Sequence, residues 1–353
     1  MQENSKAGLD HSEIIENIQA IKDRLGKELM ILTHHYQRKE IVKLGDFAGD
    51  SFELSRRAAA DSDCRYIVFC GVHFMAESAA ILCQPHQIVQ IPNVNAGCWM
   101  ASMAEAATVK GAWEEISRAA GKERVIPVVY MNSDAELKAF CGRNGGTVCT
   151  SSNASRAIQW AFDAGEKLLF FPDQHLGRNV GFDLGLKAED MVVWSPGKPL
   201  GGNTPEAVSR ARMILWDGYC LVHTRFTVEQ MAKMRSEFPE ARIVVHPECT
   251  HEVVAMADAC GSTSYIANYV KEAPSGSTII IGTEINLIHR MSLDYPDKKV
   301  IDLQNSLCPN MFKINLGNLL WTLNNLGRVN VVTVPEKVKA EAKLALDRML
   351  SLP

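Results

Sequence analysis

The sequence of 353 residues lacks most of the local patterns from which a site can be recognised by spacing alone. It contains no glycine-rich dinucleotide fingerprint and no P-loop, which removes the commonest nucleotide-binding motifs. No two of its ten cysteines form a C-x-x-C pair, so the usual local zinc and ferredoxin patterns are absent as well. The formal charge of −4 comes with no basic stripe, which argues against nucleic acid as a partner.

Long apolar runs are missing too. Residues 1–25 are polar and amphipathic, without the apolar core of about 7–15 residues that marks a secretory signal or the span of about 20 that crosses a membrane. We therefore expect a cytoplasmic protein with no membrane partner. Because thiols stay reduced in that compartment, the cysteines are expected to serve metal ligation, catalysis or burial rather than disulfides.

What the sequence does contain is a recurrence of short hydrophobic runs, each followed by polar residues and a helix-like stretch. This alternation is typical of βα units with parallel strands buried on both faces, and so of an α/β fold. At about 100–200 residues per domain, and with too many units for one small sheet, we expect three domains. Their predicted ranges are 1–112, 113–218 and 219–308, with 309–353 packing on the first. The runs predicted as strands are LMILTHHY (29–36), YIVFCGVHF (66–74), VIPVVYMNS (125–133), KLLFFPDQH (167–175), YCLVHTRF (219–226), RIVVHPEC (242–249) and STIIIGTE (277–284).

Polar side chains gather at the ends of these runs, where ligands bind in open α/β sheets. They are His34, His35, Tyr36, Asn132, His246, Glu248 and Glu284. Side-chain alternation places Tyr130 with Asn132 on one strand face, and His246 with Glu248 on another. Helices are predicted to begin after Asp50, after Asp134 and after Thr227, and their free N–H groups suit carboxylate or phosphate. Residues 142–146 and 194–206 are predicted loops.

The cysteines cannot be sorted by spacing, since an isolated cysteine is most often a small buried hydrophobe. That interpretation covers Cys64, Cys70, Cys83, Cys141, Cys149 and Cys260, and it leaves Cys249 open. Three others lie at chain turns from which a thiolate can point into a shared cleft: Cys98 after NVNAG, Cys220 after WDG, and Cys308 before Pro309.

A dozen stretches between about residue 30 and residue 325 carry a family resemblance. They are THHYQ (33–37), GDSFELS (49–55), GVHFMAESAAIL (71–82), NAGCWMA (96–102), VVYMNS (128–133), CTSSNA (149–154), FPDQHLG (171–177), CLVH (220–223), VVHPEC (244–249), GSTSYI (261–266), GTE (282–284) and CPNM (308–311). In this order they resemble the quinolinate synthase family, also called the quinolinate synthetase A protein family.

The resemblance implies three α/β/α sandwich domains with parallel sheets, in pseudo-threefold arrangement around a central cleft. It implies one 4Fe–4S cluster per chain, held by Cys98, Cys220 and Cys308, with a fourth iron left open as a Lewis acid. The implied reaction condenses iminoaspartate (iminosuccinate) with dihydroxyacetone phosphate to quinolinate, in de novo NAD biosynthesis. An L-aspartate oxidase or an aspartate dehydrogenase would then supply the iminoaspartate.

The resemblance also assigns side chains. The substrate-binding positions that it implies are His34, Ser51, Tyr130, Met131, Asn132, Ser151, His246, Pro247, Glu248 and Thr263. The catalytic positions are Tyr36, Glu248, His246 and His223, with Glu248 as the candidate general base. Because the interval 132–151 is a few residues longer than in the family, with GRNGG as the insertion, Ser152 stays an alternative to Ser151.

Structural roles compete with several of these assignments. His34 and His35 could simply end a strand, Tyr130 could be a core residue, and Ser51 and Thr263 could only cap helices. Met100, Met103 and Met131 favour packing over a soft-metal site. Two other functions also stay open: a different hydro-lyase or aldolase using a cluster or a divalent metal in the same cleft, and a non-catalytic protein that binds small acids.

Overall fold

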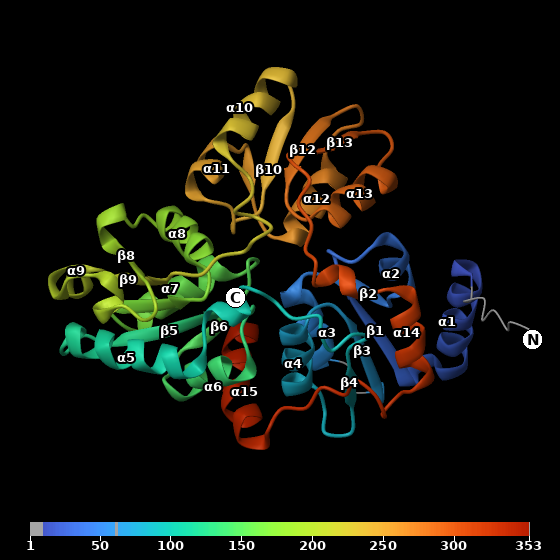
Figure 1. Ribbon diagram of the computed structural model, residues 1–353, viewed down its shortest axis with the longest axis horizontal. Coiled ribbons are helices and arrows are strands. Elements are labelled where there is room, and N and C mark those ends of the chain that lie inside the picture. Colours follow the sequence, from blue (N-terminus) through green and yellow to red (C-terminus); the bar gives the residue numbers. More distant parts are fainter. Residues whose placement is uncertain (1–9, 61–62, 353) are drawn as a thin grey trace, which may run out of the picture.

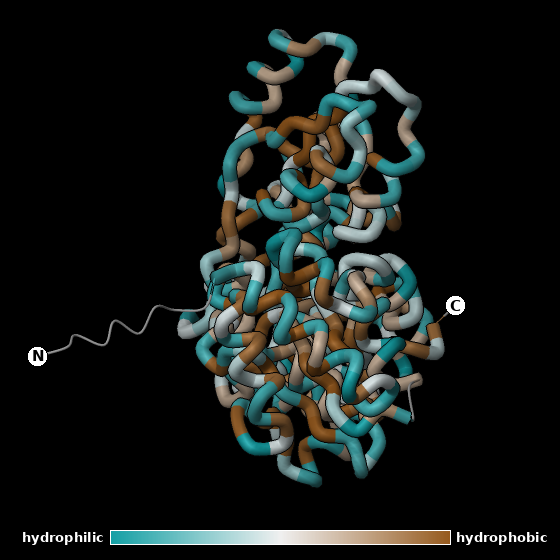
Figure 2. Tube along the Cα trace, turned by 90° about the vertical axis from the view of Figure 1, so that its right-hand side faces the viewer, coloured by the Kyte–Doolittle hydropathy of each residue, from teal (hydrophilic) through white to brown (hydrophobic). Residues whose placement is uncertain are grey.

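The computed structural model describes residues 10–60 and 63–352 and has the predicted α/β architecture. Three parallel sheets, each flanked by helices, form three units around a common centre (Figure 1). In the unit drawn at the top of both views, which contains residues 242–302, hydrophobic stretches run through the inside and hydrophilic stretches surround them (Figure 2). Within the described residues, no helix has the length and apolar character needed to cross a bilayer.

The first unit holds a four-stranded sheet in the order β2-β1-β3-β4. All six residues of β1 are buried, as expected for a central parallel strand covered on both faces. Its strands are β1 (Leu29–His34), β2 (Phe47–Gly49), β3 (Tyr66–Cys70) and β4 (Ile88–Gln90), and its helices are α1 (His11–Leu25), α2 (Lys39–Leu44), α3 (Ser51–Ala60), α4 (His73–Leu82) and α14 (Leu316–Asn324).

The second unit holds a five-stranded sheet in the order β6-β5-β7-β9-β8. Its strands are β5 (Val125–Tyr130), β6 (Thr147–Cys149), β7 (Lys167–Phe171), β8 (Met191–Trp194) and β9 (Met213–Trp216). Its helices are α5 (Ala106–Ala120), α6 (Ala135–Arg143), α7 (Ala154–Ala164), α8 (Gln174–Asp183) and α9 (Pro205–Arg210).

The third unit holds a four-stranded sheet in the order β11-β10-β12-β13, one face of which has a hydrophobic cluster of its own around Ile243, Val245 and Ile280. Its strands are β10 (Arg242–Val245), β11 (Ala259–Cys260), β12 (Thr278–Gly282) and β13 (Lys299–Asp302), and its helices are α10 (Val228–Glu237), α11 (His251–Met256), α12 (Thr263–Glu272) and α13 (Ile285–Asp294). The chain ends in α15 (Glu336–Ser351). Short 3-10 turns occur at η1 (Gly26–Glu28), η2 (Ala101–Met103), η3 (Ala188–Asp190), η4 (Pro199–Gly202) and η5 (Met311–Lys313).

Two local predictions were wrong. Residues 219–226 form turns rather than a strand, because the carbonyl oxygen of Cys220 accepts the N–H groups of His223 and Thr224. The sheet position is taken instead by β9, just before this segment. The predicted loop 142–146 also begins too early, since Gly142 and Arg143 are the last two residues of α6.

The unit boundaries differ from the predicted ranges at two places. The predicted boundary after residue 112 falls inside α5, which packs against α6 and α9 of the second unit. Of the C-terminal segment, α14 lies against α1 of the first unit, but α15 packs mainly on α6 and β6 of the second unit, with a smaller contact on α4 (Figure 1). The physical reason is Gly142, whose missing side chain lets the backbone of α15 approach α6 closely.

Gly142→Ala is therefore expected to destabilise the protein. A methyl carbon at this position would lie 1.9 Å from the carbonyl oxygen of Glu341, so α15 would have to shift. Overpacking of this kind costs about 1–3 kcal/mol of unfolding free energy. Chemical denaturation measures the change, and Gly111→Ala is the matched control because that exposed helical position has open space. A Gly142→Ala protein as stable as the control would contradict the close packing of α15.

Candidate active site

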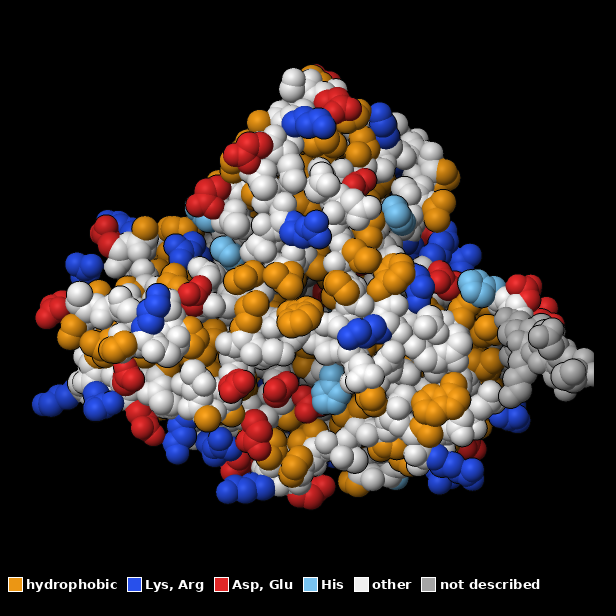
Figure 3. All heavy atoms as spheres, viewed as in Figure 1, with side chains coloured by type: hydrophobic (Ala, Val, Ile, Leu, Met, Phe, Trp, Pro, Cys, Tyr) orange, Lys and Arg blue, Asp and Glu red, His pale blue; other side chains and the backbone are white. Residues whose placement is uncertain are grey.

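A cavity lies where the three units meet, and each unit contributes to its wall. The predicted site residues that line it are His34, Tyr36, Ser51, Cys98, Tyr130, Asn132, Ser151, Cys220, His223, His246, Glu248, Thr263 and Cys308. Hydrophobic side chains gather on the surface near this meeting point (Figure 3). Trp99 and Leu221 are lining residues that stay 62% and 44% exposed, so the cavity reaches solvent past apolar side chains.

Two of the predicted residues are not among the residues that line the cavity. Met131 is fully buried, with its Sδ 3.1 Å from the hydroxyl of Ser78. The carbonyl oxygen of Pro247 accepts a hydrogen bond from Asn179 at 2.9 Å. Of the two alternative serines, Ser151 lines the cavity, whereas the hydroxyl of Ser152 donates to the Asp50 carboxylate.

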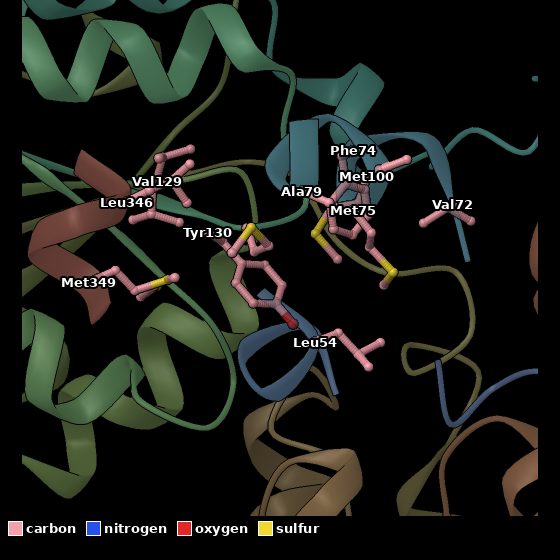
Figure 4. Packing of buried hydrophobic residues seen from close by; sticks show 14 of the residues in the cluster. Leu54, Val72, Phe74, Met75, Ala79, Met100, Val129, Tyr130, Leu346 and Met349 are labelled. Atoms are coloured by element: carbon pink, nitrogen blue, oxygen red, sulfur yellow. The ribbon is translucent and has the colours of Figure 1, made fainter. Parts of the chain in front are cut away.

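The parallel sheets explain why these side chains meet. His34 ends β1, Tyr130 ends β5 and His246 follows β10, and the carboxyl ends of parallel strands are where α/β folds place ligands. Figure 4 shows Tyr130 at the edge of a hydrophobic cluster, with its hydroxyl pointing away from Val129 and Leu346. Tyr130 is thus a core residue along its ring and a site residue at its hydroxyl.

One hydrogen-bonded network joins the three units inside the cavity. The Tyr36 hydroxyl of the first unit lies 2.7 Å from Thr283 Oγ1 and 3.3 Å from His223 Nε2. His223 Nδ1 lies 2.8 Å from Glu248 Oε2, and the Tyr130 hydroxyl of the second unit donates to Glu248 Oε1 at 2.5 Å. Glu248 therefore receives hydrogen bonds on both carboxylate oxygens.

These contacts set the protonation of the network. Burial raises the pKa of Glu248, but the neighbouring His223 and His246 outweigh burial and lower it to about 2, so the carboxyl is ionised. Burial, followed by the charge of Glu248, raises the pKa of Tyr130 well above 10, so its hydroxyl keeps its proton. An ionised carboxylate only accepts hydrogen bonds, so His223 must carry a proton on Nδ1. In neutral His223, Nε2 then faces Tyr36 and Thr283 as an acceptor.

Two further histidines are held neutral in one tautomer. Burial is the main cause that lowers the pKa of His34 to about 4 and that of His246 to about 3. The Nδ1 atom of each accepts a backbone N–H two residues later, from Tyr36 at 3.1 Å and from Glu248 at 3.3 Å. A neutral imidazole with an accepting Nδ1 carries its proton on Nε2. Both histidines thus bring a neutral N–H donor to the cavity wall.

Three thiols also converge on the cavity, and each comes from a loop. Burial raises the pKa of Cys98 to about 12 and raises the pKa of Cys220 and Cys308 as well. Glu248, and then Cys98 and Cys308, raise the pKa of Cys220 further. All three line the same cavity, and cysteine thiolates are the ligands of iron–sulfur clusters. The donor set therefore fits a cluster.

The thiols adjoin the hydrogen-bonded network. Ligand atoms of Cys220, His223 and Glu248 lie within 4.8 Å of one another. Since His223 and Glu248 bind each other within the hydrogen-bonded network, Cys220 is the cavity thiol that lies next to that network. The other seven cysteines are not among the lining residues. Cys249, which the sequence left open, is fully buried with its Sγ 3.9 Å from the Gly282 carbonyl oxygen.

Comparison with known proteins identifies the family of this chain. The family model described as "Quinolinate synthetase A protein" matches residues 16–351. This chain belongs to that family. It is accordingly an enzyme.

Relatives in the family match over nearly their full length. Proteins named "Quinolinate synthase" are 47% identical in Corynebacterium glutamicum, over 96% of this chain and 88% of the relative, and 49% identical in Streptomyces coelicolor, over 97% and 89%. One with the same name in Bacillus cereus is 46% identical over 97% of this chain and 94% of the relative. The match therefore covers all three units.

Sequence reasoning assigned no role to two residues that contact the cavity-lining residues. Thr283 binds both Tyr36 and His223, and its position directly after β12 was the available signal. Glu284 was predicted at a strand end, but its contact was not: its Oε1 accepts the backbone N–H of Cys308 at 3.3 Å. Burial raises the pKa of Glu284 to about 8. This buried carboxyl thus fixes the backbone of one cavity cysteine.

Proposed function

We propose that this enzyme is a cytoplasmic quinolinate synthase of NAD biosynthesis. It condenses iminoaspartate with dihydroxyacetone phosphate, releasing quinolinate, phosphate and two waters, with iminoaspartate supplied by an L-aspartate oxidase or an aspartate dehydrogenase. The observation that carries the proposal is the meeting of three thiols with a proton-transfer network in one cavity. The overall reaction is neither an oxidation nor a reduction, so proton transfer and orientation are the tasks of the side chains.

Cys98, Cys220 and Cys308 are the residues that would hold one 4Fe–4S cluster per chain. When bound through only three thiolates, such a cluster supplies an iron with an open coordination position, which is a Lewis acid. Glu284 contributes by holding the Cys308 backbone in place.

Neutral hydrogen-bond donors bind the substrates in this proposal. Both substrates are anions, and the wall offers the Nε2–H groups of His34 and His246 together with hydroxyl and amide groups. The latter belong to Ser51, Asn132, Ser151 and Thr263. Thr263 is also the first residue of α12, where N–H groups of the first turn favour carboxylate or phosphate. At the start of α3, by contrast, the N–H groups of Phe52 and Glu53 already donate to the Asp50 carboxylate.

The residues that carry out proton transfer in this proposal are Tyr36, His223 and Glu248. His223 Nε2 can take a proton through the Tyr36 hydroxyl, and the Glu248 carboxylate stabilises the imidazolium that results. Water is limited by burial, since all three side chains are nine-tenths or more buried. His223 thus acts as the general base, and Glu248 fixes the tautomer of His223.

Anaerobic purification followed by an assay with both substrates tests the proposal. We expect a brown protein with about four irons per chain that forms quinolinate. Iron-free, colourless protein from such a preparation would overturn the cluster assignment. Protein that holds the cluster but makes no quinolinate would favour the other enzyme function, a different hydro-lyase or aldolase in the same cleft.

A further inference from the structure

A second chain of hydrogen bonds joins the first and third units beside the cavity. Arg290 Nη2 of α13 lies 2.9 Å from His35 Nδ1, and His35 Nε2 lies 3.2 Å from the hydroxyl oxygen of Ser264. The Ser264 hydroxyl in turn donates to Glu53 Oε2 of α3 at 2.6 Å. None of these four side chains is among those that line the cavity. The proton network described above does not use them.

The direction of each bond follows from the arginine. A guanidinium group only donates, so His35 Nδ1 must accept and Nε2 must carry the ring proton. That proton is donated to Ser264, whose own hydroxyl proton goes to the Glu53 carboxylate. Burial and then the charge of Arg290 lower the pKa of His35 well below 6.5, which agrees with a neutral ring. The chain therefore has one self-consistent arrangement of donors and acceptors.

Burial of the charged Arg290 side chain at this position is energetically unfavourable. It is only 9% exposed, and in residues 10–60 and 63–352 no carboxylate lies within ion-pair distance of it. Asp294, which attracts it from further away, pairs with Lys39 at 2.9 Å. Among the residues that the structure describes, its Nε finds no hydrogen-bond partner. Burying a charge without a counter-ion costs stability, so this arginine contributes orientation rather than stability.

Three members of the chain adjoin cavity residues in the sequence. His35 lies between His34 and Tyr36, and Ser264 follows Thr263. Glu53 lies in the first turn of α3, two residues after Ser51, and its Oε2 also accepts the Asp50 N–H at 3.1 Å. The chain thus binds the cavity wall of the first unit to that of the third, at the interface that the Tyr36 contact with Thr283 also crosses.

We propose that His35, Ser264 and Glu53, oriented by Arg290, are positioning residues that hold Ser51 and Thr263 in register across this interface for substrate binding. The inference rests on the proposed function, because it assigns a role in binding the anionic substrates. None of the three is a catalytic residue, since none lines the cavity.

Ser264→Ala tests the proposal, because it removes the hydroxyl that joins the two units. We expect KM for dihydroxyacetone phosphate or iminoaspartate to rise about fivefold, as befits one lost hydrogen bond, with kcat within about twofold. Ser264→Thr keeps the hydroxyl and should restore KM. Ser292→Ala is the matched control, since that hydroxyl donates to the carbonyl oxygen of His289 within its own helix, α13. Glu53→Gln, which keeps an acceptor, should lie closer to wild type than Glu53→Ala.

A purely structural role gives a different result. It would lower the Tm of Ser264→Ala while leaving the KM of the folded enzyme unchanged, and that outcome would overturn the proposal. Hydrogen exchange over residues 35–37 and 263–267 gives a readout that does not depend on turnover. Exchange there should rise in Ser264→Ala but not in Ser264→Thr, and equal exchange in both would also overturn it. A wild-type enzyme that makes no quinolinate would instead overturn the proposed function. The hydrogen-exchange result would still test the role of the hydrogen-bond chain from Arg290 to Glu53.

Discussion

Cys220→Ala protein, purified without oxygen, is expected to lack the cluster absorbance and to form no detectable quinolinate. Cys220 lines the cavity together with the other two thiols, and its Sγ lies within 4.8 Å of ligand atoms of His223 and Glu248, so its loss removes one of three thiolates. Loss of an outer-shell partner alone costs a metal site about 10–100-fold, and a direct ligand should cost more. Cys98→Ala and Cys308→Ala should behave in the same way. Iron and sulfide analysis beside the quinolinate assay measures the effect.

Cys83→Ala is the matched control for these three variants. Cys83 is a half-buried free thiol like them, but it is not among the cavity-lining residues. It should keep about four irons and wild-type turnover. A Cys220→Ala protein with full iron content would show that the cluster is held elsewhere in the chain.

Glu248→Gln is expected to lower kcat by about 10³–10⁴ while the cluster stays bound. The amide can still accept from Tyr130, but its NH₂ group meets the Nδ1–H of His223, so two donors face each other. The His223 proton must then move to Nε2, which can no longer accept from Tyr36. The corresponding change in a Ser-His-Asp triad costs about 10⁴ in kcat for the same reason.

Steady-state kinetics with iron analysis checks this prediction. Glu252→Gln is the control, because that carboxyl lies on the same segment but is exposed and outside the cavity. Retention of more than a tenth of wild-type kcat by Glu248→Gln would rule out a role for Glu248 in fixing the His223 tautomer.

The sequence predicted local structure better than it predicted contacts. Runs of buried residues identified β1, β5 and β10 correctly, because two-sided burial leaves a continuous hydrophobic pattern. The same pattern misled at 219–226, where hydrophobic residues line a cavity and a turn instead of a sheet. Hydrophobicity reports burial and does not say against what a residue is buried.

Contacts between units could not be read from periodicity at all. Tyr130 and Glu248 are 118 positions apart, and nothing in either neighbourhood indicates that they share a hydrogen bond. Likewise the choice of three cysteines from ten came from family motifs, and the packing of α15 depends on the small size of Gly142. These features arise from how completed units dock, which local propensity does not encode.

The network from Tyr36 through His223 and Glu248 to Tyr130 draws one end from the first unit, its middle from the third and its other end from the second. No single unit contains all the residues of this network. The network is therefore complete only when the three units are docked, and its formation follows the docking equilibrium. A ligand that bridges the cavity must tighten the docking of the units by the same free energy with which docking favours the ligand. A ligand bound across this cavity would therefore act as a non-covalent cross-link between the units, and its release would require that the same contacts loosen.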